Sequence, residues 1–580
     1  MLFGRRGVIT GMAGLAGTVY ARTVVARSSG ASVGDASWRQ LKAQVGGRLV
    51  RVRSPLAACA EAHSAGAAEL FKRIQNPYLL GDEAGLTQTL GWTDAWTSQP
   101  STYAVVAENA ADVAAAVTFA RRHDVRLVVK GGGHSYFGNS NAAHSLLVWT
   151  RRMQAINIEP AFRPDAAPDT SESIPAVSIG AGAIWGRVYD TVAVTGDRYV
   201  QGGGCLTVGV AGFVSGGGFG SLSKEFGTGA GNLIEAEVVT ADGRVRIANR
   251  YREPDLFFAL RGGGGGTFGI ITRLTLRTDP LPTTIGAAQL RVTARSDAAW
   301  RTLVARIIAF YATSLFNPAW GEQIRFSPGR KLSVAMTCHG LDSLAIKTVW
   351  QPFTDWLAAR SGDYALEGAP LMVAVPARQF WDPAFLRSVP GVVLSDDRYG
   401  TSSANVFWTG NQSEAAQVLH AYQSAWLPSA LLAFDRQASL ADALVAAANV
   451  WSVTLHANKG MAGGTPEARA RVGETATNSA LLDAFALLIC AAEGPPAWPG
   501  IRGHEPDIAS GRLDAAHVRR AMEPIRNLVP GAGSYMSESD YFGTDWQHAY
   551  WGKHYDRLLS IKRRYDPDKL FVGHHTVGSS

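Results

Sequence analysis

Two glycine-rich stretches, about seventy residues apart, constrain this chain more than any other feature of its sequence. The first, residues 131–135, reads GGGHS, and the second, residues 202–220, begins GGGCLTVG and contains nine glycines. Runs of glycine let the main chain approach a ligand closely and let its N–H groups point at phosphate oxygens. Because His134 and Cys205 each follow three glycines directly, we expect both side chains to lie against whatever ligand is bound.

Composition and charge narrow the class of protein. The chain has 580 residues, enough for more than one folding unit, and its 46% hydrophobic and 18% charged residues are ordinary for a globular protein. The net charge of +7 is spread along the sequence, so no basic block predicts a nucleic-acid partner. The four cysteines lie far apart without a CxxC pair, so neither a metal site nor a disulfide framework is expected, and a disulfide at Cys59 stays open.

The N-terminus is typical of an export signal. Arg5 and Arg6 precede an apolar run at residues 8–19 that is too short to span a bilayer and ends in small residues. Paired arginines before a mildly apolar segment resemble a twin-arginine signal, which carries folded proteins across the membrane. We therefore expect an exported protein, periplasmic or extracellular, with no membrane span elsewhere in the chain.

A strand–helix–strand unit is expected to deliver the chain into the first glycine stretch. Residues 102–107 and 125–130 have the pattern of strands, and Asn109 is a predicted N-cap for a helix that ends near Arg122. A ligand loop at the end of such a unit is the usual layout of an α/β binding site.

Other nucleotide-binding and catalytic motifs fit poorly. Residues 264–269 match the spacing of a dinucleotide fingerprint, but residues 270–277 alternate like a strand where that motif requires a helix. A Rossmann fold is therefore disfavoured. The sequence also lacks a GxSxG elbow and a phosphate-loop GK[ST], which weakens hydrolase and kinase interpretations.

Two hairpins are predicted. Residues 236–247, after the second glycine stretch, should turn back at Asp242-Gly243. From residue 279 the chain has fewer glycine runs, and there residues 322–326 should pair with residues 331–338. Residues 451–458 predict a strand whose polar members share one face. Such a face is usually solvated, but it could equally line a cleft.

Together these motifs resemble the berberine-bridge-enzyme-like branch of the vanillyl-alcohol-oxidase flavoproteins. That family carries GGHS and GGGCxTVG in the same order. Residues 535–540 also resemble its YxNxxD segment, with Ser537 at the Asn position, and residues 550–571 resemble its closing motif, with His554 where Asn is usual.

The resemblance implies an α+β fold with a two-part PCMH-type FAD-binding domain and an α/β substrate domain built on an antiparallel sheet. The implied division is a signal peptide at residues 1–26, an FAD-binding domain at 27–280 with its core at about 95–280, a substrate-binding domain at 281–530 and a berberine-bridge-like segment at 531–580 that returns to the FAD domain.

The resemblance also implies FAD attached by two covalent bonds. In this family His134 would bond the 8α-methyl carbon of the flavin ring, and Cys205 would bond its C6 position. The other expected cofactor contacts are Lys130, Gly131, Gly132, Gly133, Ser135, Gly204, Val208, Gly209, Gly212, Ser215, Gly216, Gly217, Gly269 and Ile270. Among them, Lys130 could add positive charge near the pyrophosphate, although a lysine at the end of a strand is more often solvated.

Hydride transfer to flavin atom N5 requires a group that takes the substrate proton. The candidates are Tyr535, placed by the YxNxxD resemblance, and Glu538, His456 and Lys459. A tyrosine is a poor base unless a cation lowers its pKa, and Lys459 is the expected cation.

The implied activity is oxidation of an alcohol-type group on a small molecule, saccharide or secondary metabolite, with O₂ as the electron acceptor. Two alternatives stay open. One is a dehydrogenase of the same fold that uses another acceptor, and the other is a non-catalytic binding protein that keeps the fold.

Overall fold

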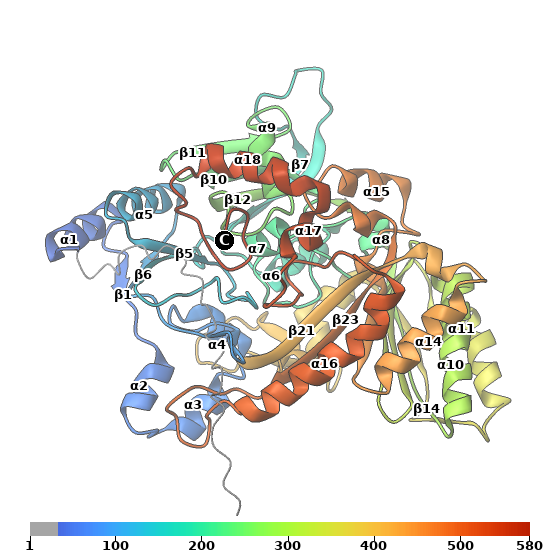
Figure 1. Cartoon of the computed structure of the whole chain (residues 1–580). Coiled ribbons are helices and arrows are strands. Elements are labelled where there is room, and N and C mark those ends of the chain that lie inside the picture. The colour runs from blue at the N-terminus through green and yellow to red at the C-terminus, as the bar shows by residue number, and fades with distance from the viewer. Residues whose placement is uncertain (1–32, 580) are drawn as a thin grey trace, which may run out of the picture.

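A computed structural model describes residues 33–579, and the expected signal peptide lies outside this range. The described chain forms two halves (Figure 1). The blue-to-green half and the red C-terminal helices lie together, and the yellow and orange half lies beside them with its own sheet and helices.

A four-stranded sheet leads into the first glycine stretch. Its spatial order is β1 (Leu49–Arg51), β4 (Tyr103–Val106), β6 (Ser145–Trp149) and β5 (Arg126–Lys130). Helix α5 (Ala110–Arg122) connects β4 to β5, and Asn109 caps it by accepting a 3.0 Å hydrogen bond from the N–H of Asp112. The predicted strand–helix–strand unit is confirmed, with β6 inserted between its strands and parallel to both.

A five-stranded antiparallel sheet follows. Its spatial order is β11 (Val245–Asn249), β10 (Leu233–Val239), β12 (Ile270–Arg277), β8 (Ile174–Gly180) and β7 (Ile156–Phe162). The predicted hairpin is confirmed in β10 and β11. Strand β12 follows the glycines at 264–269 directly, where a dinucleotide fingerprint would need a helix, so the Rossmann alternative is excluded.

The second half is built on a ten-stranded sheet, antiparallel apart from one strand pair. Its strands in order are β17 (Tyr364–Leu366), β14 (Thr284–Ala294), β16 (Lys331–His339), β15 (Trp320–Ser327), β22 (Val453–His456), β23 (Ala484–Gly494), β21 (Gln417–Pro428), β2 (Thr89–Trp92) and β3 (Trp96–Thr97), with β18 (Leu371–Pro376) also on β14. Helices α10 (Asp297–Phe310), α11 (Ser343–Ala358), α14 (Gln437–Ala448) and α16 (Ile508–Leu528) cover one face and bury the largest core cluster (Figure 1).

Two sequence expectations need correction here. Strands β2 and β3 lie within the segment expected to belong to the FAD-binding domain, yet β2 pairs in parallel with β21 of the larger sheet. All four residues of β2 are buried, and the strand packs against both halves, since Trp92 shares a core cluster with Phe137 and Leu419. The strand expected at 451–458 ends at His456, and the 3₁₀ turn Ala457–Lys459 follows, which places Asn458 in a turn.

The C-terminal segment returns to the first half. Helix α18 (Tyr555–Tyr565) lies beside α9 (Pro254–Leu260), and α17 (Trp546–Trp551) contacts α18 (Figure 1). The indole N–H of Trp551 donates to the carbonyl of Gly262 over 3.0 Å, and the ammonium of Lys562 donates to the carbonyl of Thr267 over 2.6 Å. The last fifty residues therefore complete the half that carries the glycine stretches.

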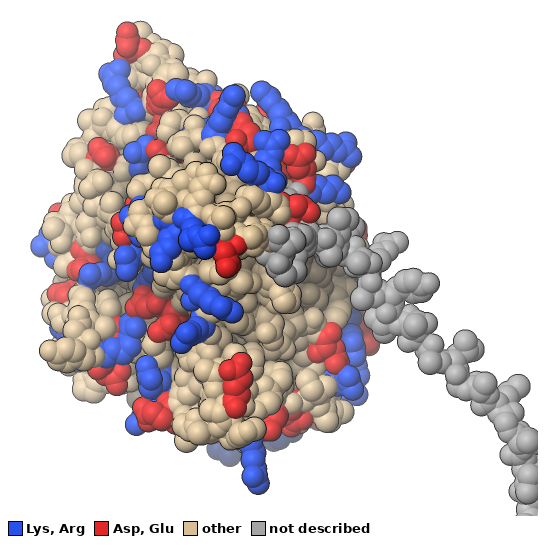
Figure 2. All heavy atoms as spheres, turned by 90° about the vertical axis from the view of Figure 1, so that its left-hand side faces the viewer, with Lys and Arg blue, Asp and Glu red and all other residues tan. Residues whose placement is uncertain are grey.

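Charged side chains of both signs are interspersed over the face shown in Figure 2. Among residues 33–579, no helix is both long enough and apolar enough to cross a membrane.

Candidate active site

One large cavity joins the two halves. Its volume is about 1060 Å³, and its walls run from residues 126–129 of β5 to strands β14, β15 and β16 of the larger sheet. Pockets for single small molecules usually measure about 300–1,000 Å³. This cavity can therefore hold a bulky cofactor together with a substrate.

His134 and Cys205 both line the cavity and are bridged by one hydroxyl group. The Thr207 Oγ1 atom lies 3.3 Å from His134 Nε2 and 3.5 Å from Cys205 Sγ. Because Nε2 faces Thr207, Nδ1 is the ring nitrogen available to a ligand. The two glycine-rich stretches therefore bring His134 and Cys205 together in space, as expected.

Burial sets the protonation of both side chains. It lowers the pKa of His134 to about 4, so the imidazole is neutral near pH 7 and keeps a lone pair. Burial also raises the pKa of the Cys205 thiol, while the Thr207 hydroxyl and the N–H groups of Thr207 and Val208 oppose that rise. Cys205 is thus half-buried and has donors in place to stabilise a thiolate.

The glycine stretches form a cradle that fits a dinucleotide. A Cβ atom added at Gly132 would meet the nitrogen of Gly209 at 2.6 Å, so the two stretches pack main chain against main chain. Gly204 and Gly212 line the cavity with no atom within 4 Å of such a Cβ. The N–H groups of residues 132–136 donate to no described residue, and successive free N–H groups of this kind suit a pyrophosphate.

Most expected cofactor contacts line this cavity, and two do not. Those that do are Gly131, Gly132, Gly133, His134, Ser135, Gly204, Cys205, Val208, Gly209, Gly212, Ser215, Gly216, Gly269 and Ile270. Gly217 lies behind the wall, where an added Cβ would meet the side chains of Thr477 and Tyr535 at 2.9 and 3.4 Å.

The expectation for Lys130 is wrong. Its side chain is only 1% exposed and lies outside the cavity wall. The ammonium donates to the carbonyls of Glu83, Ala84 and Leu86 over 2.6, 3.1 and 2.8 Å, and burial lowers its pKa to about 7. Its role is to tie the segment before β2 to the end of β5.

All four expected catalytic residues line the cavity, but they are paired differently from the expectation. The ammonium of Lys459 binds the carboxylate of Glu538. Tyr535 accepts a long, 3.4 Å hydrogen bond from the N–H of Gly218, and burial followed by the charge of Glu538 raises its pKa to about 12. The expected lowering of this pKa by Lys459 is therefore wrong.

His456 occupies the end of β22 beside this ion pair. Burial, together with the nearby charges of Lys459 and Arg325, holds its pKa well below the usual value for histidine. The imidazole is therefore neutral near pH 7, and the same burial and positive charges make it a weak base.

Several cavity residues were not expected from the sequence. Tyr136 and Tyr422 face each other with ring centroids 5.3 Å apart, and Glu414 accepts a 3.0 Å hydrogen bond from Asn411. Burial raises the pKa of Glu414. Only Tyr136 had a sequence signal, since it directly follows the GGGHS stretch, whereas the others come from connections without a motif.

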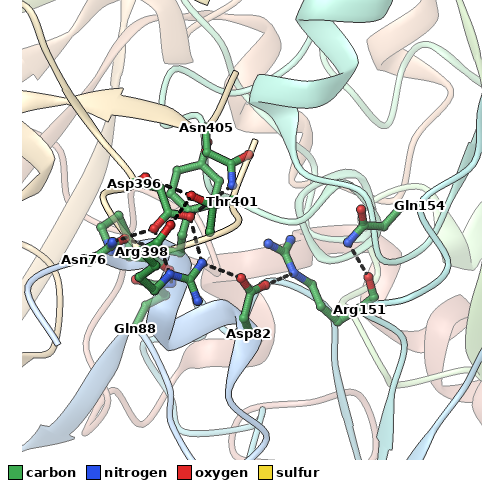
Figure 3. A network of polar contacts seen from close by, with 11 residues as sticks. Asn76, Asp82, Gln88, Arg151, Gln154, Asp396, Arg398, Thr401 and Asn405 are labelled. Atoms are coloured by element: carbon green, nitrogen blue, oxygen red, sulfur yellow. Dashed lines mark hydrogen bonds and ion pairs between the residues drawn. The ribbon is translucent and has the colours of Figure 1, made fainter. Parts of the chain in front are cut away.

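A hairpin covers the cysteine side of the cavity. Its strands are β19 (Val393–Ser395) and β20 (Val406–Trp408), and the indole N–H of Trp408 donates to the carbonyl of Gly204 over 2.7 Å. The polar network in Figure 3 anchors this hairpin: Arg398 pairs at 2.7 Å with both Asp396 and Asp82. Asp82 also pairs with Arg151 at 2.8 Å, so the hairpin is tied to the first half of the chain.

Comparison with known proteins identifies the family. Residues 101–249 match the family described as FAD binding domain, and residues 526–578 match the family described as berberine and berberine like. The FAD-linked oxidoreductase easE of Arthroderma benhamiae is 31% identical over 82% of this chain and 89% of its own length. The chain belongs to the berberine-bridge-enzyme-like FAD-linked oxidases.

Solved structures show the same fold. The VAO-type flavoprotein MtVAO615 of Myceliophthora thermophila has a TM-score of 0.73 and 24% identity over 94% of this chain and 95% of its own. Glucooligosaccharide oxidase of Acremonium strictum, described with a 6-S-cysteinyl, 8α-N1-histidyl FAD, has a TM-score of 0.62 and 20% identity over 90% and 98%. This berberine-bridge-enzyme-like chain is an FAD-dependent oxidoreductase, and the expected α+β fold is confirmed.

Proposed function

We propose that this protein is an exported oxidase that converts an alcohol-type group of a small molecule, saccharide or secondary metabolite to a carbonyl. FAD is bound covalently through His134 and Cys205, and O₂ is the electron acceptor. The observation that carries the proposal is the His134–Thr207–Cys205 bridge within a single cavity.

Thr207 prepares both side chains for their bonds. Attachment through Nδ1 requires the tautomer in which His134 Nε2–H donates to Thr207. The Thr207 hydroxyl can then donate to the sulfur of Cys205, which favours its thiolate. The linkages described for glucooligosaccharide oxidase use the same two residue types.

Once bound, FAD supplies the acceptor for the substrate hydride. The glycine cradle holds the phosphates with main-chain N–H groups and leaves the substrate end to Tyr535, His456 and the Lys459–Glu538 pair. The neutral His456 can accept a hydrogen bond from the substrate hydroxyl, and the neutral phenol of Tyr535 can donate one to the substrate oxygen.

The decisive experiment concerns the two covalent bonds. His134→Ala and Cys205→Ala should each leave the flavin attached by one bond, so that only the double variant releases it on acid denaturation. Both single variants should oxidise substrate more slowly. If Cys205→Ala keeps the flavin spectrum and covalent mass of the parent, Cys205 is a packing residue and the doubly covalent assignment fails.

The acceptor and the export route have separate tests. Peroxide release during turnover supports an oxidase, whereas turnover only with a dye acceptor supports the dehydrogenase alternative.

Replacement of Arg5 and Arg6 with lysines should leave flavinylated, uncleaved precursor in the cytoplasm, because twin-arginine receptors read the pair itself. Unchanged processing would exclude this route.

A further inference from the structure

Glu322 has an unfavourable main-chain conformation in the middle of strand β15. Its φ angle is +72°, in the left-handed region that glycine tolerates and a residue with a Cβ atom avoids. The cross-strand register around it is regular, and Glu322 pairs with Met336 without a shift. Residues held in such conformations cluster at functional sites, where the surrounding structure maintains the strain.

The unusual angle changes the face on which the Glu322 side chain lies. Paired residues of an antiparallel sheet share a face, and Met336 packs in the helix-covered core with its neighbours Trp320 and Ile324. The opposite face lines the cavity, with members Ala287, Gln289, Gln323, Thr337 and His456. Glu322 belongs to the core face by position, yet it lines the cavity. The left-handed angle thus takes a carboxyl group out of the core and presents it to the substrate end.

Neighbouring donors hold the Glu322 carboxyl group in place. Ser221 Oγ donates to Oε1, the Asn458 Nδ2 amide donates to the same atom over 3.4 Å, and the side chain of Gln323 also interacts with the carboxyl group. A carboxylate can accept about four hydrogen bonds, so Glu322 keeps capacity for a donor from a ligand.

Asn458 supplies a second acceptor beside the first. Its side chain lines the cavity and is only 3% exposed, and its Oδ1 atom has no partner among residues 33–579. A buried carbonyl without a partner is costly, so a bound ligand that donates to it is favoured. Because the amide nitrogen is committed to Glu322, the oxygen is the atom left for the ligand.

Burial favours a neutral donor at this site. It raises the pKa of the Glu322 carboxyl group, and the charge of Lys459 opposes that rise while the charge of Glu538 adds to it. The ammonium of Lys459 is paired with Glu538, so these two charges largely offset each other. An ammonium group would have to give up its hydration to reach the subsite, whereas two neighbouring hydroxyl groups satisfy both acceptors without burying a further charge.

We propose that Glu322 and Asn458 form a substrate subsite that binds two adjacent hydroxyl groups, so that the preferred substrate carries a vicinal diol. This inference rests on the proposed oxidation of an alcohol, and it names the substrate class of that same site. It assigns Glu322 to specificity and not to proton transfer.

Binding of matched ligands to the oxidised holoenzyme tests the subsite. The ligands are styrene glycol, phenethyl alcohol and phenethylamine, which share one skeleton, and binding is followed anaerobically by perturbation of the flavin absorbance. The parent should bind the glycol at least tenfold more tightly than the mono-alcohol. Glu322→Gln should abolish that preference, because its amide N–H₂ replaces an acceptor with a donor, and binding of phenethyl alcohol should change less than twofold.

Glu253→Gln is the matched control variant, since Glu253 is also left-handed and hydrogen-bonded but lies outside this cavity. It should keep the preference for the glycol. The proposal is overturned if the parent does not prefer the glycol, if Glu322→Gln keeps the preference or weakens both ligands equally, or if phenethylamine binds most tightly. Since these are binding measurements, they stay informative even when no ligand reduces the flavin, which would contradict only the proposed oxidation.

Stability distinguishes a functional from a structural role. Glu322→Gly relieves the left-handed strain, so its melting temperature should equal or exceed that of the parent while the preference for the glycol is lost. A clearly lower melting temperature would mean that the carboxyl group holds β15 to Ser221, and that its conformation is maintained for folding. That result would overturn the proposal.

Discussion

The ammonium of Lys459 binds the carboxylate of Glu538 and not the phenol of Tyr535. This pairing determines the chemistry available to the phenol, because the charge that acts on Tyr535 is the negative charge of Glu538. With a pKa of about 12, Tyr535 is protonated throughout the physiological range and serves as a hydrogen-bond donor.

Glu538→Gln should therefore lower the pKa of Tyr535. The substitution removes a negative charge that disfavours the phenolate and frees the ammonium of Lys459, and both changes favour ionisation. A titration of tyrosinate absorbance, with Tyr535→Phe as the baseline, should show the transition at lower pH than in the parent. Glu493→Gln is the control, because Glu493 acts on Tyr136 and Tyr422 but not on Tyr535. A transition moved to higher pH would contradict the assignment.

Tyr535→Phe should slow anaerobic flavin reduction by roughly a hundredfold, as is typical when a hydrogen-bond donor to charge developing on the substrate oxygen is lost. The ring, its volume and its contact with Phe219 are retained, so flavin content should equal that of the parent. Reduction at the parental rate, combined with slow reduction in His456→Ala or Glu538→Gln, would transfer the role to that residue.

Thr207→Val should slow the accumulation of covalently bound flavin by at least tenfold. Valine keeps the shape of threonine but removes the hydroxyl that contacts both His134 and Cys205. Flavin retained by acid-denatured protein, measured over time after reconstitution, reports the rate. Thr207→Ser keeps the hydroxyl and should flavinylate nearly as fast as the parent; equal rates in the Val and Ser variants would contradict the bridging role.

Local patterns predicted much of the fold. Period-two alternation predicted β12 and the hairpins, and the Asn109 cap predicted the start of α5. The glycine stretches predicted the cradle because the close approach of Gly132 and Gly209 leaves no room for a Cβ atom. Each of these features depends on residues near one another in the sequence or on a main-chain requirement that only glycine meets.

Pairings between distant segments were not predictable in this way. Lys130 looked like a phosphate ligand because it precedes the glycines, but its partners are carbonyls more than forty residues earlier. Lys459 and Glu538 are 79 residues apart, and only the folded chain selects one partner for the ammonium. The left-handed φ angle of Glu322 turns its side chain out of the core and into the cavity, which breaks the alternation of period two. A sequence pattern could therefore place this residue only on the core face.

Lys130→Met should destabilise the protein while leaving its flavin content unchanged. Methionine fills a similar volume but donates no hydrogen bond, so the carbonyls of Glu83, Ala84 and Leu86 lose their shared partner inside the protein. Buried acceptors without partners cost about 1–3 kcal/mol. Denaturant unfolding should show a loss in this range, whereas acid-precipitated protein should retain as much covalent flavin as the parent. If instead the flavin content falls while the stability is unchanged, Lys130 acts on the cofactor, and the structural role assigned to its three hydrogen bonds is wrong.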